Sequence, residues 1–199
     1  MQTQLTKNKK LQRKFFLAQR RALTASERQA YSAEIKEKII NCAAYKKARM
    51  CFLFAAMPDE VQTKELIVDA LKAGKRVCLP YITDKKGGIM QAAEISSFEE
   101  LVAGAYGILS VDETKLRIVN PRDIDFVLVP GVGFDRRGYR LGMGGGFYDR
   151  FLAQTVNAYL AAAVYDCQLA DEVTKDEHDA KVHAVFTEKC SLDFLKKYT

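Results

Sequence analysis

Four short and almost unbroken apolar segments constrain the fold of this chain most strongly. They occupy residues 50–56, 76–81, 125–130 and 159–165, and polar or helical patterns separate them. A strand that is apolar at nearly every position is typical of a sheet that is covered on both faces. Strands that alternate with helices predict a parallel sheet with right-handed crossovers. We therefore expect a three-layer α/β fold in which helices flank a mainly parallel sheet.

The first helical pattern begins near residue 8. At 100° per residue, one side of this helix collects apolar residues within about 60° of one another, which predicts a stripe that faces the core. The apolar stripe consists of Leu11, Phe15, Ala18 and Ala22, and a basic stripe of Lys9, Arg13 and Arg20 lies opposite.

A second helix is predicted to start at a capping box formed by Thr24 and Glu27 and to run to about residue 45. Its inward residues are expected to be Ile35, Ile39 and Ile40. Further helices are expected over about residues 59–73, ended by Gly74 as a cap, and over about residues 145–154. Because the sequence contains no repeat and no linker-like stretch, residues 1–199 are expected to form one domain, with the helices of about residues 8–45 packed on the sheet.

Charge and cysteine content narrow the class of protein. Lys and Arg (31) exceed Asp and Glu (25), and the resulting net charge of +6 suits anionic ligands. No apolar run approaches the roughly 18 residues that a membrane-spanning helix requires. The five cysteines are scattered, odd in number and without a CxxC pair, so we expect free thiols. These features predict a cytoplasmic protein without membrane contacts.

The densest functional signal is a glycine-rich segment over residues 130–150, PGVGFDRRGYRLGMGGGFYDR. It follows an apolar segment and precedes a helical pattern, which places it at the carboxyl edge of the sheet, where ligands bind in α/β folds. Glycines let backbone N–H groups converge on an anion, and Arg140 and Arg150 can add charge-assisted contacts to phosphate. The segment is neither a Walker A loop nor a GxGxxG loop. A tight turn that needs glycine for steric reasons is the alternative, and the flanking arginines favour phosphate binding.

Three carboxylates each have two interpretations. Asp149 lies in the first turn of a predicted helix, where the helix dipole stabilises an acid, or it holds Mg²⁺ beside a phosphate. Asp179 is a second candidate metal ligand or a solvated loop acid. Glu60 is a surface acid after an Asp59–Gln62 capping box, or it projects into the same cleft as the glycine-rich segment.

The remaining polar groups are less specific. The basic stripe of the first helix is a solvated face, a source of cations for a triphosphate, or a nucleic-acid contact. Aromatic residues do not interleave with these cations as base-stacking platforms require, which disfavours nucleic acid. His178 and His183 are the only histidines, and they form no Ser-His-Asp or zinc pattern.

The segment GVGFDRRGYRLGMGGGFYDRFL, over residues 131–152, closely resembles the signature of the 5-formyltetrahydrofolate cyclo-ligase family, whose members are also called methenyltetrahydrofolate synthetases. Segments 9–23, 58–63 and 177–179 also resemble that family, in the same order along the chain. The resemblance implies a three-layer α/β fold and the ATP- and Mg²⁺-dependent conversion of 5-formyltetrahydrofolate to 5,10-methenyltetrahydrofolate, with release of ADP and phosphate. It implies phosphorylation of the formyl oxygen and attack by the substrate's own N10.

The resemblance also assigns residues to roles. The expected ATP contacts are Lys9, Arg13, Arg140, Leu141, Gly142, Met143, Gly144, Gly145, Gly146, Phe147 and Tyr148. The expected folate contacts are Ala55, Glu60, Met143, Gly144, Gly145, Gly146 and Phe147. Arg140 and Tyr148 would act in catalysis, and Asp149 with Asp179 would hold Mg²⁺. The expected partners are small molecules rather than nucleic acid or membrane, and the expected state is a monomer or a weak dimer.

Three positions depart from the family pattern. Gln12 stands where the family usually has Leu, and we expect little harm because the helical period puts it off the apolar stripe. Phe147 replaces a common Tyr, and His183 replaces a common acid. Two other functions remain as alternatives: a relative on the same scaffold that acts on a sugar phosphate or a coenzyme A ester, and a nucleic-acid-binding module.

Overall fold

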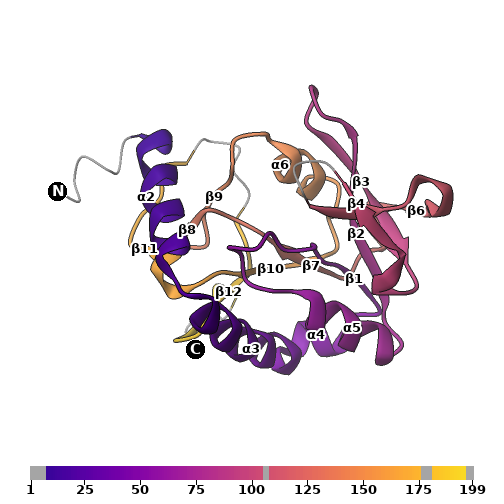
Figure 1. The fold of residues 1–199 in the computed structure, drawn as a ribbon, viewed down its shortest axis with the longest axis horizontal. Helices are drawn as coiled ribbons and strands as arrows, with labels where there is room; N and C mark the ends of the chain where they lie inside the picture. The colour runs from indigo at the N-terminus through magenta and orange to yellow at the C-terminus, as the bar shows by residue number, and fades with distance from the viewer. Residues whose placement is uncertain (1–7, 105–107, 176–180, 196–199) are drawn as a thin grey trace.

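A large sheet forms the centre of the molecule (Figure 1). This is a computed structural model, and it describes residues 8–104, 108–175 and 181–195. Within these residues the sheet has eight strands in the order β13-β12-β10-β7-β1-β2-β3-β6. The inner strands are parallel: β1 (Met50–Phe52), β2 (Arg76–Asp84), β7 (Phe126–Val129), β10 (Tyr159–Ala163) and β12 (Ala184–Phe186). Antiparallel pairings add β3 (Ile89–Ile95) and β6 (Ile118–Val119) at one edge and β13 (Ser191–Asp193) at the other. The expected mainly parallel sheet is confirmed.

The four apolar segments all contribute strands, although the first is shorter than its apolar run. β1 ends at Phe52, and the chain leaves the ladder after Leu53 donates to the Cys78 carbonyl at 2.9 Å. Phe54 and Ala55 remain buried. The apolar pattern therefore correctly indicated that residues 50–55 are buried, but only Met50–Phe52 pair as a strand.

Helices cover both faces of the sheet (Figure 1). One face carries α3 (Ala25–Asn41), α4 (Ala43–Lys47) and α5 (Lys64–Lys72), and the other carries α6 (Phe147–Leu152). Ile35 and Ile39 of α3 are buried among strand residues on the first face, and Phe151 of α6 is buried on the second. Ile40 is only partly buried. Helices on both faces explain why the inner strands need apolar residues at consecutive positions.

Local signals fix some helix ends and miss others. The capping box is present, because the Thr24 amide donates to Glu27 Oε2 at 2.7 Å and the Glu27 amide donates to Thr24 Oγ1 at 3.2 Å. Gly74 follows α5 in the left-handed region with φ 75°. The helix expected from residue 59 begins instead at Lys64, so the Asp59–Gln62 capping box is wrong. The helix expected over residues 145–154 is the six-residue α6.

The remaining elements are short and lie around the sheet. A three-stranded sheet consists of β11 (Leu169–Ala170), β8 (Gly133–Asp135) and β9 (Arg140–Leu141), and β4 (Leu101–Ala103) pairs with β5 (Leu109–Val111). Single 3₁₀ turns are η1 (Phe98–Glu100), η3 (Glu113–Lys115), η4 (Pro121–Asp123) and η5 (Asp166–Gln168). Among the described helices, none combines the length and the apolarity that crossing a bilayer requires.

Helix α2 (Lys9–Ala22) packs beside the three-stranded sheet and presents an unexpected face to it (Figure 1). The predicted apolar stripe is wrong, because the side chains of Leu11 and Phe15 are 48% and 44% exposed. The buried residues of α2 are Gln12, Phe16 and Arg20. On this side of α2, Phe16 packs into a small apolar core, and neighbouring loops supply the partners that the buried Gln12 and Arg20 require.

Candidate active site

A small pocket opens at the carboxyl ends of β1, β7 and β10, the edge at which open α/β sheets bind ligands. Segments that follow these three strands line it, and α2 closes one side with Arg20. The lining residues are Arg20, Phe54, Glu60, Val61, Pro130, Gly131, Ala163 and Gln168. The structure thus brings Glu60 and the start of the glycine-rich segment to one place, as the position of both segments after strands predicted.

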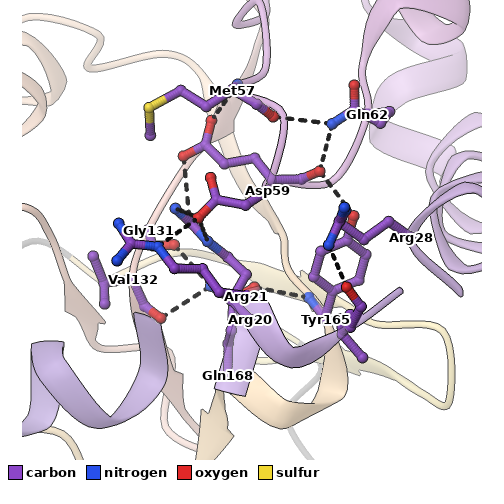
Figure 2. A network of polar contacts seen from close by, with 12 residues as sticks. Arg20, Arg21, Arg28, Met57, Asp59, Gln62, Gly131, Val132, Tyr165 and Gln168 are labelled. Carbon is purple, nitrogen blue, oxygen red and sulfur yellow. Dashed lines mark hydrogen bonds and ion pairs between the residues drawn. The ribbon is translucent and has the colours of Figure 1, made fainter. Parts of the chain in front are cut away.

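Arg20 holds two carboxylates at this pocket, as Figure 2 shows for Asp59. Its guanidinium donates to Asp59 Oδ2 at 3.2 Å and 2.9 Å and to Glu60 Oε1 at 3.3 Å. The Arg20 side chain is only 2% exposed, whereas neighbouring Arg21 is 68% exposed and reaches Asp59 at 3.4 Å. Arg20 therefore does not belong to a solvated basic stripe, and Glu60 is a partly buried acid of the pocket rather than a solvated surface acid.

The Glu60 carboxylate retains capacity for a ligand. Its Oε2 accepts from the Met57 amide at 3.0 Å and its Oε1 accepts from Arg20. An ionised carboxylate has about four acceptor positions, so about two remain. Burial raises the pKa of Glu60, while the Met57 amide and the charge of Arg20 oppose that rise. Its main chain is also fixed, because Tyr165 donates its hydroxyl to the Glu60 carbonyl at 2.8 Å.

The glycine-rich loop between β9 and α6 is held from α2. Arg13 donates from Nε to the Gly142 carbonyl at 2.7 Å. Gly144 adopts φ 100°, and a Cβ built there would lie 3.5 Å from the Arg13 guanidinium. Gly146 adopts φ 69°. Arg13 and the loop are therefore brought together as expected. Because α6 has only six residues, its helix dipole is a weak source of positive potential at this loop.

Arg140 and Asp149 form an ion pair at the base of this loop. The Arg140 side chain is 7% exposed and the Asp149 side chain is 42% exposed. The Arg140 guanidinium also lies 5.7 Å from the centre of the Tyr148 ring. A half-exposed carboxylate with one basic partner keeps acceptor positions free for a cation. Within the described residues, however, no cluster of three or more His, Cys, Asp or Glu residues is arranged to bind a metal.

Tyr148 carries an unsatisfied polar group. Its hydroxyl is buried and has no hydrogen-bond partner among the described residues. Burial, and then the negative charge of Glu60, raise the pKa of Tyr148, whereas the charge of Arg140 lowers it. The hydroxyl is therefore protonated at neutral pH. Leaving a buried hydroxyl unpaired costs about 1–3 kcal/mol, and a substrate group is one way to satisfy it.

The other expected contact residues lie on α2, after β1 and along the glycine-rich loop. Lys9 begins α2, one turn before Arg13. Leu141 is buried in a small core with Phe16, so its side chain is unavailable to a ligand. Met143 is 61% exposed. Ala55 is buried after β1, and Phe147 is partly buried on the α6 side of the sheet.

The side chains of Arg150 and His183 are engaged by backbone groups. Arg150 donates to the carbonyls of Gly88 and Gly145 at 3.4 Å and 3.2 Å, which ties the loop to the β2–β3 connection. His183 directly precedes β12, and its Nδ1 accepts from the Leu160 amide at 3.0 Å, so it supports the sheet. Asp179, with its neighbour His178, lies outside the described residues.

Sequence reasoning missed three buried polar residues that organise the site. Gln12 hydrogen-bonds the Glu172–Thr174 segment, Arg20 binds the carboxylates near residue 60, and Gln168 donates to the Gly131 and Val132 carbonyls at 3.0 Å and 2.9 Å. Figure 2 shows Gln168 and Arg20 close together below the Met57–Gln62 segment. The spacing of residues 12, 16 and 20 is helical, but no apolar pattern marks a buried polar side chain.

Comparisons with known proteins identify the family. A sequence model of the 5-formyltetrahydrofolate cyclo-ligase family matches residues 5–188. A 5-formyltetrahydrofolate cyclo-ligase from Mus musculus is 33% identical over 178 residues, which cover 84% of this chain and 87% of the relative. The 5-formyltetrahydrofolate cyclo-ligase from Escherichia coli (strain K12) is 34% identical over 173 residues, which cover 84% of this chain and 93% of the relative.

The fold gives the same result. The NMR structure of 5,10-methenyltetrahydrofolate synthetase from Aquifex aeolicus matches this chain with a TM-score of 0.85 and 30% identity. That match covers 96% of this chain and 95% of the other. Sequence and fold agree over nearly the whole length and support an enzyme with cyclo-ligase activity. The chain therefore belongs to the 5-formyltetrahydrofolate cyclo-ligase family.

Proposed function

We propose that this enzyme uses ATP and Mg²⁺ to cyclise 5-formyltetrahydrofolate to 5,10-methenyltetrahydrofolate. The observation that carries the proposal is the position of Tyr148. Its buried hydroxyl has no hydrogen-bond partner among the described residues, and the Arg140 guanidinium lies 5.7 Å from the centre of its ring. An acceptor for a pterin and a cationic glycine-rich loop for phosphates thus share one edge of the sheet with an available hydroxyl.

The chemistry makes limited demands on the protein. A formamide carbon is a poor electrophile and its oxygen is a poor leaving group. When the formyl oxygen attacks the γ-phosphorus, the bond to ADP breaks and an imidate-like phosphate forms. N10 of the same substrate then attacks the formyl carbon, the carbon–oxygen bond breaks as phosphate leaves, and N10 loses its proton. The substrate supplies the nucleophile, so the protein provides positioning and charge neutralisation, as in other phosphoryl transfers.

The nucleotide side of the site is assigned to α2 and the glycine-rich loop. Lys9 and Arg13 would contact the phosphates from α2, and the N–H groups of residues 140–148 would contact them from the loop. Arg140 would neutralise charge on the transferring phosphoryl group, because its guanidinium is fixed by Asp149 at the base of the loop. Mg²⁺, when bound, would neutralise further phosphate charge.

The metal assignment rests on the donor set. Asp149 is half exposed, and within the described residues its carboxylate pairs with Arg140, which fits a cation that takes one or two carboxylates together with phosphate oxygens. Asp149 and Asp179 are the residues that would hold it. A metal that depends on the nucleotide for most of its ligands needs no cluster of protein side chains beforehand.

The folate contacts are assigned to the segment that follows β1 and to residues of the glycine-rich loop. Glu60 would accept hydrogen bonds from pterin N–H groups with its two remaining acceptor positions, and Ala55, which follows the pocket residue Phe54, would add an apolar contact to the folate. Residues 143–147 would face the formyl group at the point of transfer. Tyr148 would donate a hydrogen bond from its hydroxyl to an oxygen of the reacting groups. We further propose a cytoplasmic enzyme that is a monomer or a weak dimer and acts on small molecules rather than nucleic acid.

An absorbance assay tests this function. Purified protein is mixed with 5-formyltetrahydrofolate near neutral pH, where acid cyclisation is slow, and formation of the methenyl product is followed in the near ultraviolet. A rise that requires both ATP and Mg²⁺ is expected. A flat trace from folded protein that still binds ATP would show that the scaffold acts on another substrate.

Variants of the loop sharpen this assay. Arg140→Ala is expected to abolish turnover, whereas Arg136→Ala is the matched control, because Arg136 is 58% exposed and pairs only loosely with Asp171 at 3.7 Å. Asp149→Asn is expected to shift the Mg²⁺ titration to higher concentration. A fully active Arg140→Ala variant, or an unchanged Mg²⁺ titration for Asp149→Asn, would remove that residue from the mechanism.

A further inference from the structure

Gln12 is a buried amide whose two ends are both hydrogen-bonded. It is 4% exposed on α2. Its Nε2 donates to the Glu172 carbonyl at 3.4 Å, and its Oε1 accepts from the Thr174 amide at 2.8 Å. A single side chain therefore joins α2 to a segment about 160 residues later in the chain. The helical period placed Gln12 away from the buried face of the helix, and that placement is wrong, because Gln12 is one of the buried residues of α2.

The segment that Gln12 binds is anchored to the base of the glycine-rich loop. Asp135, which is fully buried, accepts from the Val173 amide at 3.4 Å. The same carboxylate accepts from the amides of Arg137 and Tyr139 at 2.9 Å and 3.0 Å, which fixes the turn between β8 and β9. β9 then leads directly into the loop. A continuous set of hydrogen bonds thus runs from α2 to the turn that precedes the loop.

Arg13 follows Gln12 in the sequence and makes the contact between α2 and the loop itself. It donates to the Gly142 carbonyl at 2.7 Å and lies against Gly144. Successive residues of a helix are separated by about 100° around the axis and about 1.5 Å along it. The direction of the Arg13 side chain therefore depends on how α2 is rotated about its own axis. The Gln12 amide opposes such a rotation, because both of its hydrogen bonds are directional.

We propose that Gln12 is a positioning residue that locks α2 to the Glu172–Thr174 segment and thereby holds Arg13 against the glycine-rich loop for nucleotide binding. The inference rests on the proposed function, since it assumes that the loop and Arg13 bind phosphates. The sequence resemblance gives Leu at this position in the family. An apolar side chain cannot form hydrogen bonds, so the two bonds that join Gln12 to the Glu172–Thr174 segment distinguish this chain from that pattern. Gln12 itself does not touch the substrates.

The test compares two variants on the same buried face of α2. Gln12→Met keeps the length of the side chain and removes both hydrogen bonds, whereas Phe16→Leu, one turn later, removes only packing against Val132, Leu141 and Val173. The dissociation constants of ATP and of 5-formyltetrahydrofolate are measured separately by calorimetry, together with the thermal midpoint. For Gln12→Met the ATP constant is expected to rise about tenfold, the value of one charge-assisted hydrogen bond, with an unchanged folate constant.

The control and a double variant exclude a purely structural role. Phe16→Leu is expected to lower the thermal midpoint while it leaves both dissociation constants unchanged. If Gln12 acts through Arg13, then Gln12→Met has no further effect on ATP binding in an Arg13→Ala background. Should Gln12→Met fail to fold, Gln12→Leu decides, because it also removes both hydrogen bonds without burying a charge, and its ATP constant is expected to rise by a similar factor.

The outcomes separate this inference from the proposed function. An unchanged ATP constant in a folded Gln12 variant, an equal loss of ATP and folate binding, or additive effects of Gln12→Met and Arg13→Ala would each overturn the positioning role. A wild-type protein that binds no ATP would overturn the proposed function first, and the positioning role with it.

Discussion

Replacement of Arg20 by Met tests how much its ion pairs with Asp59 and Glu60 stabilise the fold. Arg20 is 2% exposed, and the carboxylates of Asp59 and Glu60 are 23% and 14% exposed. Arg20→Met would leave both acids without their main cation in a mostly desolvated place. Breaking a buried ion pair by removal of one partner costs about 3–5 kcal/mol, and the residual exposure of the acids favours the lower end, about 3 kcal/mol.

Arg21 provides the matched control, because it is adjacent in sequence and contacts the same carboxylate. Its side chain is 68% exposed and lies 3.4 Å from Asp59 Oδ2. Exposed pairs contribute about 0–1 kcal/mol, so Arg21→Met is expected to change the free energy of unfolding by less than about 1 kcal/mol. Urea unfolding at pH 7.5 measures both variants. Equal losses for the two variants, or a loss below about 1 kcal/mol for Arg20→Met, would refute the assignment of a buried ion pair.

The pH dependence of the Arg20→Met variant gives an independent check. Burial already raises the pKa of Glu60, and Arg20 opposes that rise. Without Arg20, the folded-state pKa lies further above the unfolded value of about 4.3, so the folded state binds more protons between the two values. The deficit of Arg20→Met should therefore shrink as the pH falls from 7.5 toward 5. Addition of Glu60→Gln to Arg20→Met should recover part of the loss at pH 7.5, because it removes the buried charge.

Three further predictions concern single positions. Tyr148→Phe should leave the free energy of unfolding unchanged or raise it by up to about 1 kcal/mol, because the hydroxyl has no partner among the described residues. Its turnover should fall about tenfold or more, and a turnover equal to that of the wild type would exclude a role for the hydroxyl. Burial lowers the pKa of His183, whose Nδ1 must stay unprotonated to accept from the Leu160 amide. The free energy of unfolding should therefore decrease as the pH falls below about 6.5, and His183→Asn should make this pH dependence weaker. In urea unfolding, Phe16→Ala should lower the free energy of unfolding by about 3 kcal/mol or more, and Phe15→Ala should lower it by less than about 1 kcal/mol. The reverse order would show that the side of α2 predicted from the sequence is the buried one.

Segments with strong local or patterned signals were predicted well. The parallel strands were located because residues buried on both faces of a sheet must be apolar at consecutive positions. The Thr24–Glu27 box and Gly74 marked helix ends because capping depends on side chains within a few residues of one another. The glycine-rich segment was placed at the correct edge of the sheet for the same kind of reason, since a segment that follows a parallel strand emerges at its carboxyl end.

Predictions failed where a side chain is stabilised by a distant partner. The helical period of α2 placed Leu11 and Phe15 inward, yet Phe16 and two polar residues are buried instead. Asp59 was interpreted as a helix cap because a capping residue and a salt-bridge partner have the same local sequence. In both cases the deciding contacts join residues that are tens of residues apart or more, and these contacts leave no trace in the local period.

The sequence by itself determined the layered α/β architecture, the edge at which the site lies and, through its motifs, the family. These features follow from short-range patterns and from the rule that parallel strands end at a common edge. Only the tertiary structure decided which side of α2 is buried, that Arg20 holds Glu60 and that Gln12 joins α2 to the Glu172–Thr174 segment. It also decided that the Tyr148 hydroxyl is buried with no hydrogen-bond partner within the described part of the chain. The physical reason is that a buried polar group is tolerated only when the complete fold provides its partner, and that partner is not encoded near it.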